Sequence, residues 1–278
     1  MNPISVDPIT PAIGAEIGGI DLSVLSADQD IEKIYHALIQ FHVIVIRGQK
    51  ITSEQHLNFA RLLGTPQPPH PVYPHVEGFE NIMVLHHHAD NPPDTDGWHT
   101  DVTYQEKPPF ASVLVSRKVP PAGGDTLWCS LARAYDTLPD PIKQELEGKR
   151  AVHDMGDFRN NFTVDEKDAA RLVDAHQRFG SSIHPVVQTH PISGRKYLYV
   201  NESFTQLIVG MRQNDSNRLL NYLYNHINQP ENQMRLRWEP DTLVMWDNRC
   251  TWHYATADYL PAERIMHRIT LTDDLREH

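Results

Sequence analysis

Residues 242–253 read TLVMWDNRCTWH, and this stretch decides the fold. Its first part, Thr242 to Trp246, is short and apolar, as in a buried strand. Asp247-Asn248 then indicates a turn, and His253 follows shortly after it. Further β-like runs occupy 111–116, 197–200, 234–238 and 264–272, and turn residues such as Gly123-Gly124 and Ser193-Gly194 punctuate them. Short strands separated by turns are typical of a barrel or double-sheet architecture, so a mainly β fold with flanking helices is expected.

The flanking helices are predicted from caps and apolar spacing. Ser26-x-x-Gln29 resembles a capping box, and apolar residues at helical spacing follow it, which predicts a helix over 27–40. The run from Val43 to Ile46 is β-branched and apolar on both faces, which favours a buried strand. Thr52-x-x-Gln55 opens a second helix that stops at Gly64. Helices are also expected over 131–148 and 215–228, where they would cover an outer sheet face.

Length and composition set broad limits. The 278 residues fit a single domain over 1–278 with insertions around 65–98 and 154–182. The formal net charge of -11 opposes nonspecific attraction to nucleic acid, so no nucleic-acid partner is expected. Only Cys129 and Cys250 occur, and the N-terminus lacks a signal-peptide pattern. A reduced cytoplasm and no membrane association are therefore expected.

Two segments show little periodicity. Residues 65–98 are rich in Pro, His and Asn, and a long, mostly irregular excursion is expected there. Residues 154–182 are polar and weakly patterned, and we interpret them as a helical insertion or an active-site lid. Loops of such length in compact domains are often functional.

A metal site is predicted from residues far apart in sequence. A histidine with an acid two residues later occurs at His75-Val76-Glu77, His88-Ala89-Asp90 and His99-Thr100-Asp101. Only the third lies in a segment that alternates like a strand, where residues i and i+2 share one face and can reach one ion. Taken singly, such a pair is more often an exposed hydrogen-bonded pair, and His253 a structural histidine. Together, two imidazoles and one carboxylate can hold three adjacent positions of a first-row metal and indicate a non-haem iron(II) oxygenase.

The last β-like run adds two cations. Arg264 and Arg268 share one face of the predicted strand, while Ile265, Ile269 and Leu271 occupy the other. If the apolar face packs under helices, both guanidiniums point into the barrel, where they need anionic partners such as a carboxylate or sulfonate. The alternative is that both face solvent. His70 and Tyr73, in the irregular excursion, are further candidates, whereas His86-His87-His88 is interpreted as a loop because consecutive residues do not converge on one ion.

With these residues in view, the chain resembles the iron(II)/2-oxoglutarate-dependent dioxygenases of the taurine dioxygenase type. The matching segments are Ile13 to Ile17, His70 to His75, Asn91 to Asp94, Trp98 to Thr103, Gly123 to Trp128, His184 to Val187, Trp246 to Arg249 and Arg264 to Arg268. The resemblance implies a double-stranded β-helix, or jelly-roll, core with His99, Asp101 and His253 as iron ligands. It assigns Thr126 and Arg264 to the distal carboxylate of 2-oxoglutarate. It assigns His70, Tyr73, Phe204 and Arg268 to the prime substrate.

The resemblance also implies an activity. The expected reaction hydroxylates the carbon next to a sulfonate, taurine or similar, with iron(II), 2-oxoglutarate and dioxygen, and yields sulfite, an aldehyde, succinate and carbon dioxide. Thr95 and Tyr104 depart from the residues expected in taurine enzymes. The alternatives are an alkyl sulfate, aminophosphonate or carboxylate substrate, a zinc-dependent hydrolase and a noncatalytic binding protein. The family also suggests a homo-oligomer, a dimer or tetramer.

Overall fold

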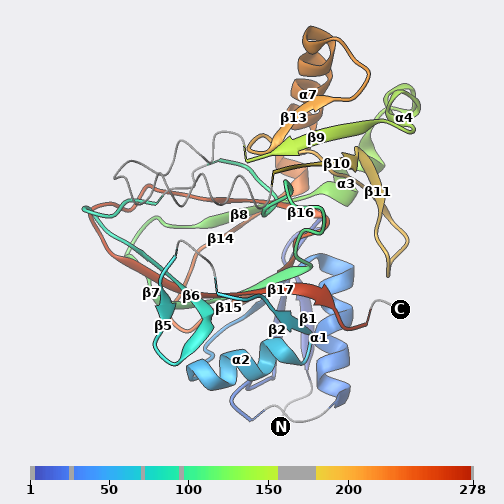
Figure 1. Ribbon diagram of the computed structural model, residues 1–278. Coiled ribbons are helices and arrows are strands. Elements are labelled where there is room, and N and C mark those ends of the chain that lie inside the picture. The colour runs from blue at the N-terminus through green and yellow to red at the C-terminus, as the bar shows by residue number, and fades with distance from the viewer. Residues whose placement is uncertain (1–3, 25–27, 70–72, 94–96, 156–179, 277–278) are drawn as a thin grey trace.

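The computed structural model describes residues 4–24, 28–69, 73–93, 97–155 and 180–276 and is mainly β with flanking helices (Figure 1). The largest sheet has the order β1 (Ser5–Pro8), β2 (Ala15–Gly18), β3 (Val43–Ile46), β15 (Leu243–Asp247), β7 (Ala111–Lys118), β17 (Arg264–Asp274), β6 (Phe79–His87) and β5 (His75–Val76), with β4 (Gly64–Pro66) paired to β17. Its neighbours run antiparallel, apart from the parallel pair of β2 and β3.

A second sheet has the order β14 (Gln233–Leu236), β8 (Thr126–Ser130) and β16 (Thr251–Ala255). Beyond it lie a sheet of β10 (Ser181–Pro185), β9 (Arg150–Asp154) and β13 (Thr205–Ile208), and a pair of β11 (Val187–Thr189) and β12 (Lys196–Leu198). The described helices are α1 (Asp28–Phe41), α2 (Ser53–Arg61), α3 (Leu131–Thr137), α4 (Asp140–Leu146), α7 (Gln213–Ile227) and a 3-10 turn (Pro230–Asn232).

Three apolar clusters separate these layers. Helices α1 and α2 cover one face of the large sheet, and Leu38, Phe59 and Ile269 belong to the cluster between them (Figure 1). A second cluster, including Trp128, Trp246 and Met266, lies between the large sheet and the sheet of β8. A third lies between that smaller sheet and α3 and α7. Burial of apolar side chains in all three is the main force that holds the layers together.

The predicted helices and strands are largely confirmed. The capping box at the start of α2 is present, because the Thr52 and Gln55 side chains each accept from the other residue's backbone N–H. The helix predicted over 131–148 is instead two short helices. Pro139 lies between them and holds the preceding Leu138 extended, with ψ of 142°. Proline restricts the residue before it in this way and so ends the first helix.

Two expectations are wrong. Residues 65–98 are not mostly irregular, because β6 contributes nine residues to the large sheet and pairs with Arg264–Arg268 of β17. That pairing partner is about 180 residues away, so periodicity within the segment could not reveal it. The segment around His99-Thr100-Asp101, which alternates like a strand, forms only one bridge, between His99 and His253, and the chain turns at residues 101–104. Of the segment 154–182, predicted to be a helical insertion or a lid, residues 156–179 lie outside the described residues, and its two ends belong to β9 and β10.

Two further findings concern the environment of the chain. No helix among the described residues is long and apolar enough to cross a membrane. Cys129 and Cys250 are both buried and unpaired.

Candidate metal centre

The structure brings His99, Asp101 and His253 together. His253 lies on β16, and the backbones of His99 and His253 exchange two hydrogen bonds of 3.1 and 2.8 Å. The Nε2 atoms of His99 and His253 lie 3.7 and 3.6 Å from Oδ1 of Asp101. An ion about 2.1 Å from each of two ligands at right angles holds them about 3 Å apart. These two distances are therefore within about 0.7 Å of that spacing, and the candidate ligand atoms of all three residues lie within 4.8 Å of one another.

The protonation states also suit a metal. Nδ1 of His99 lies 2.8 Å from the Gly97 carbonyl and donates to it in the neutral ring, which leaves Nε2 free to coordinate. Burial lowers the pKa of His253 well below its usual value, so its ring is neutral at pH 7. Burial alone would raise the pKa of Asp101, but the charge of Arg268 and its hydrogen bond to the carboxylate hold that pKa below its usual value. The donor set is thus one carboxylate and two imidazole nitrogens, which fits iron(II).

A buried amide holds Asp101 in place. The backbone N–H of Asp101 donates to Oδ1 of the Asn248 side chain at 2.9 Å. Nδ2 of Asn248 donates to the carbonyls of Asp101 at 3.3 Å and Pro109 at 3.1 Å. Thr100 donates to the carbonyl of Thr251 at 2.8 Å. These bonds join the segment with the first two ligands to the segment before the third.

The turn after Asp101 is strained. Val102 has φ of 45°, a left-handed conformation that a β-branched residue rarely adopts. Such strain is often concentrated at functional sites, where the surrounding contacts maintain it. The side chain of the next residue, Thr103, is held by Nδ2 of Asn201 at 2.9 Å and contacts Nδ1 of His153 at 2.9 Å.

Arg264 and Thr126 meet beside this centre. Nη2 of Arg264 lies 3.5 Å from Oγ1 of Thr126, which also accepts from the indole N–H of Trp238 at 2.9 Å. Arg264 is 5% exposed, and its Nε is buried without a hydrogen-bond partner among the described residues. Burial lowers its pKa to about 10, which still leaves it charged at pH 7. A buried cation that forms no ion pair with the described residues favours an anionic ligand.

Arg268 lies on the same face of β17 and contacts one of the candidate metal ligands, Asp101, directly. It donates through Nη2 to Oδ2 of Asp101 and, at 2.7 Å, to Oγ of Ser112. Its guanidinium also lies over the Trp246 ring, 5.2 Å from the centroid. Both arginines therefore point to the side of β17 away from α1 and α2, which excludes the solvent-facing alternative.

An apolar wall lies beside His99. Phe204 packs edge-on against Tyr104 with ring centroids 5.2 Å apart, and 6.4 Å from the His99 ring. Met155 and the half-buried Val102 complete this cluster. Tyr73 is half-buried just before β5. His70 and Thr95 lie outside the described residues.

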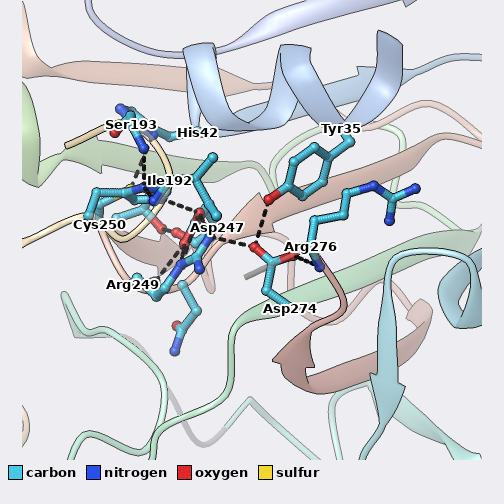
Figure 2. A network of polar contacts seen from close by, with 12 residues as sticks. Tyr35, His42, Ile192, Ser193, Asp247, Arg249, Cys250, Asp274 and Arg276 are labelled. Atoms are coloured by element: carbon cyan, nitrogen blue, oxygen red, sulfur yellow. Dashed lines mark hydrogen bonds and ion pairs between the residues drawn. The ribbon is translucent and has the colours of Figure 1, made fainter. Parts of the chain in front are cut away.

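A second buried group of potential ligands consists of His190, Asp247 and Cys250. Figure 2 shows Asp247 and Cys250 of this group together with Arg249. Nδ1 of His190 accepts from the backbone N–H groups of Ile192 and Ser193 at 3.3 and 3.1 Å, so the proton of the neutral ring is on Nε2. That Nε2 lies 2.9 Å from Oδ2 of Asp247 and donates to it. Arg249 also bonds both oxygens of Asp247. The group is therefore a satisfied hydrogen-bond network that fixes the turn between β15 and β16.

In the part of the chain that the structure describes, the two other histidine–acid pairs of the sequence do not form a candidate metal site. His75, Glu77, His88 and Asp90 form no group of three potential ligands among the described residues. His86 instead contacts Glu263, at 2.6 Å from its Nε2.

Sequence reasoning gave no role to Asn248 or Trp238. A signal for Asn248 was available, since it lies in the turn before His253 and asparagine side chains commonly bond to backbone in turns. Nothing in the sequence near Trp238 indicated that its indole meets Thr126, because that contact spans 112 residues.

The chain matches the family described as "Taurine catabolism dioxygenase TauD, TfdA family" over residues 5–270. It is 37% identical to an alpha-ketoglutarate-dependent sulfate ester dioxygenase of Pseudomonas putida, over 98% of this chain and 90% of that protein. It is 36% identical to an alkylsulfatase of Acinetobacter baylyi, over 96% of this chain and 84% of that protein. A crystal structure of a taurine dioxygenase from Burkholderia xenovorans superposes with a TM-score of 0.83 at 36% identity, covering 98% of this chain and 90% of that one.

Proposed function

The chain belongs to the TauD/TfdA family and is a 2-oxoglutarate-dependent dioxygenase, and from this premise we propose that His99, Asp101 and His253 bind one iron(II) ion. We assign the core to the double-stranded β-helix class as a single domain, which fits two facing sheets with an apolar cluster between them. Two buried, unpaired cysteines accord with a reducing compartment, and we place the protein in the cytoplasm, as a homo-oligomer by analogy with the family.

The distal carboxylate of 2-oxoglutarate is assigned to Arg264 and Thr126. The single observation that carries this assignment is the buried Arg264 guanidinium, which has no carboxylate partner among the described residues. A planar carboxylate can accept two parallel hydrogen bonds from such a group. The keto acid would then span from Arg264 to the metal-binding residues.

Iron, when bound, supplies the chemistry that activates dioxygen. The residues of the chain bind and orient the reactants. Arg264 fixes the far end of 2-oxoglutarate, Asn248 holds Asp101, and the cluster of Phe204, Tyr104 and Met155 shields one side from water.

The prime substrate is proposed to be an alkyl sulfur oxyanion, either a sulfate ester or a sulfonate. Among the described residues, Arg268 bonds only to Asp101 and Ser112, through Nε and Nη2, and its Nη1 donors are therefore available to the oxyanion. The apolar wall at Phe204 and Tyr104 suits an alkyl tail. Two relatives are named for sulfate ester chemistry, which favours an alkyl sulfate alongside a sulfonate such as taurine.

The products distinguish the two substrate classes. Hydroxylation of the carbon bonded to the sulfate oxygen gives a hemiacetal sulfate, which breaks its C–O bond to release sulfate and an aldehyde. Hydroxylation of the carbon bonded to sulfur gives an adduct that breaks its C–S bond to release sulfite and an aldehyde. In both cases 2-oxoglutarate takes one atom of dioxygen to become succinate and carbon dioxide, and the other atom becomes the new hydroxyl group of the substrate.

The test is steady-state kinetics in which 2-oxoglutarate and the sulfur oxyanion are varied separately. Arg264→Ala is expected to raise the KM for 2-oxoglutarate, and Arg268→Ala mainly the KM for the prime substrate. Identical effects of both changes on both reactants would contradict the assignment. Product release without oxygen consumption would indicate hydrolysis, the reaction expected of a zinc hydrolase.

A further inference from the structure

The Thr126 hydroxyl is oriented to donate a hydrogen bond to a ligand. Its oxygen accepts from the indole N–H of Trp238 at 2.9 Å and, more weakly, from Nη2 of Arg264 at 3.5 Å. A hydroxyl has two acceptor positions and one proton, so both acceptor positions are occupied. Thr126 is 3% exposed, and its proton has no acceptor among the described residues. The bond from Trp238 therefore turns the Thr126 O–H away from the indole and leaves it for a ligand.

Tyr259 supplies another unused donor nearby. It is 5% exposed, and its hydroxyl is buried without a hydrogen-bond partner among the described residues. A Cβ placed on Gly124 would lie 3.1 Å from Cδ1 of Tyr259 and 3.3 Å from Cδ of Arg264. The tyrosine ring and the arginine side chain thus pack against the same glycine.

Together, Thr126, Tyr259 and Arg264 have more hydrogen-bond donors than acceptors among the described residues. Unused donors remain on Thr126 Oγ1, Tyr259 Oη and Arg264 Nε, and all three atoms are buried. Each buried donor without an acceptor loses its hydrogen bonds to water and gains none in exchange. The guanidinium also lies over the Trp238 ring, 5.7 Å from its centroid, which limits its movement. An anion with two oxygens would satisfy several of these donors at once.

We propose that Tyr259 and Trp238 complete the subsite for the distal carboxylate of 2-oxoglutarate. Tyr259 donates a hydrogen bond to the carboxylate. Trp238 is a positioning residue, because its N–H holds the Thr126 hydroxyl in the donating orientation. The inference rests on the proposed function of Arg264 and Thr126, and it adds two residues that determine which keto acid is accepted.

The experiment compares 2-oxoglutarate with 2-oxobutyrate, which has the same keto acid head and no distal carboxylate. Binding of each to the manganese(II)-loaded protein is measured by calorimetric titration without oxygen. Tyr259→Phe removes only the hydroxyl, and Trp238→Phe removes the indole N–H. Each variant is expected to bind 2-oxoglutarate about tenfold more weakly, as for one hydrogen bond to a charged group, with unchanged 2-oxobutyrate affinity.

Two further variants make the outcome decisive. Trp252→Phe also loses a buried indole hydrogen bond, from Nε1 to the Val200 carbonyl at 2.7 Å, and should preserve the preference for 2-oxoglutarate. Arg264→Ala should lose that preference. The inference would be overturned if Tyr259→Phe and Trp238→Phe kept the wild-type preference for 2-oxoglutarate over 2-oxobutyrate. It would also be overturned if both variants bound the two keto acids equally more weakly. A preference retained in Arg264→Ala would instead overturn the proposed function.

Discussion

Replacing Asn248 by alanine should weaken the metal centre without touching a ligand. Asn248 is fully buried, and its side chain makes hydrogen bonds of 2.9, 3.3 and 3.1 Å to the backbone of Asp101 and Pro109. The change leaves one buried N–H and two carbonyls without these partners, at a cost of roughly 2–4 kcal/mol in unfolding free energy. The Tm should fall by about 5–10 °C. Because Asp101 loses its backbone support, iron(II) affinity should fall about 10- to 100-fold.

A second buried asparagine provides the control. Nδ2 of Asn232 donates to the carbonyls of His226 at 3.0 Å and Ile227 at 3.4 Å, at the end of α7. Asn232→Ala should lower the Tm and leave metal affinity unchanged. Thermal unfolding and anaerobic iron(II) titration of both variants provide the two readouts. The reasoning is refuted if Asn248→Ala binds iron(II) as tightly as the wild type.

Three other outcomes are expected. Burial lowers the pKa values of His56 and His153 to about 3, so the unfolded chain takes up protons first as pH falls below about 6.5. The free energy of unfolding should therefore fall as the pH drops below about 6.5, by about 2 kcal/mol per histidine at pH 5. Urea unfolding of the metal-free protein at pH 7.5 and at pH 5 measures this loss. Phe204→Ala should raise the KM for long alkyl substrates and spare that for 2-oxoglutarate, since Phe204 is part of the apolar wall; equal effects would count against that role. Gly124→Ala should weaken 2-oxoglutarate binding in calorimetric titration, because the glycine has φ of +69° and the new methyl group would press on Arg264 and Tyr259; unchanged affinity would show that the subsite tolerates it.

Much of the fold was predictable because local signals agree with the final structure. The capping box at Thr52 and the β-branched run Val43–Ile46 each specify one element without distant information. Strand β6 was missed because it is defined by its pairing with β17, and its sequence has no clean alternation. Pairing between distant strands depends on partners that a local pattern does not show.

The candidate site was also only partly predictable from the sequence. His99, Asp101 and His253 converge as expected, yet the reason given for the first two was wrong, since Asp101 lies in a turn. Chemical type and spacing indicated the ligands. The supporting contacts of Asn248 and Trp238 could not be predicted, because each depends on two segments more than 100 residues apart that meet only after folding.

The most direct test of the central claim is an anaerobic titration of the iron(II)-loaded protein with 2-oxoglutarate, followed by visible absorption. Chelation of iron by the keto acid gives a metal-to-ligand charge-transfer band. The wild type should develop this band, Arg264→Ala should need a higher concentration of the keto acid, and Asp101→Ala should not develop it. A wild-type protein that binds iron(II) and 2-oxoglutarate yet shows no such band would contradict the account.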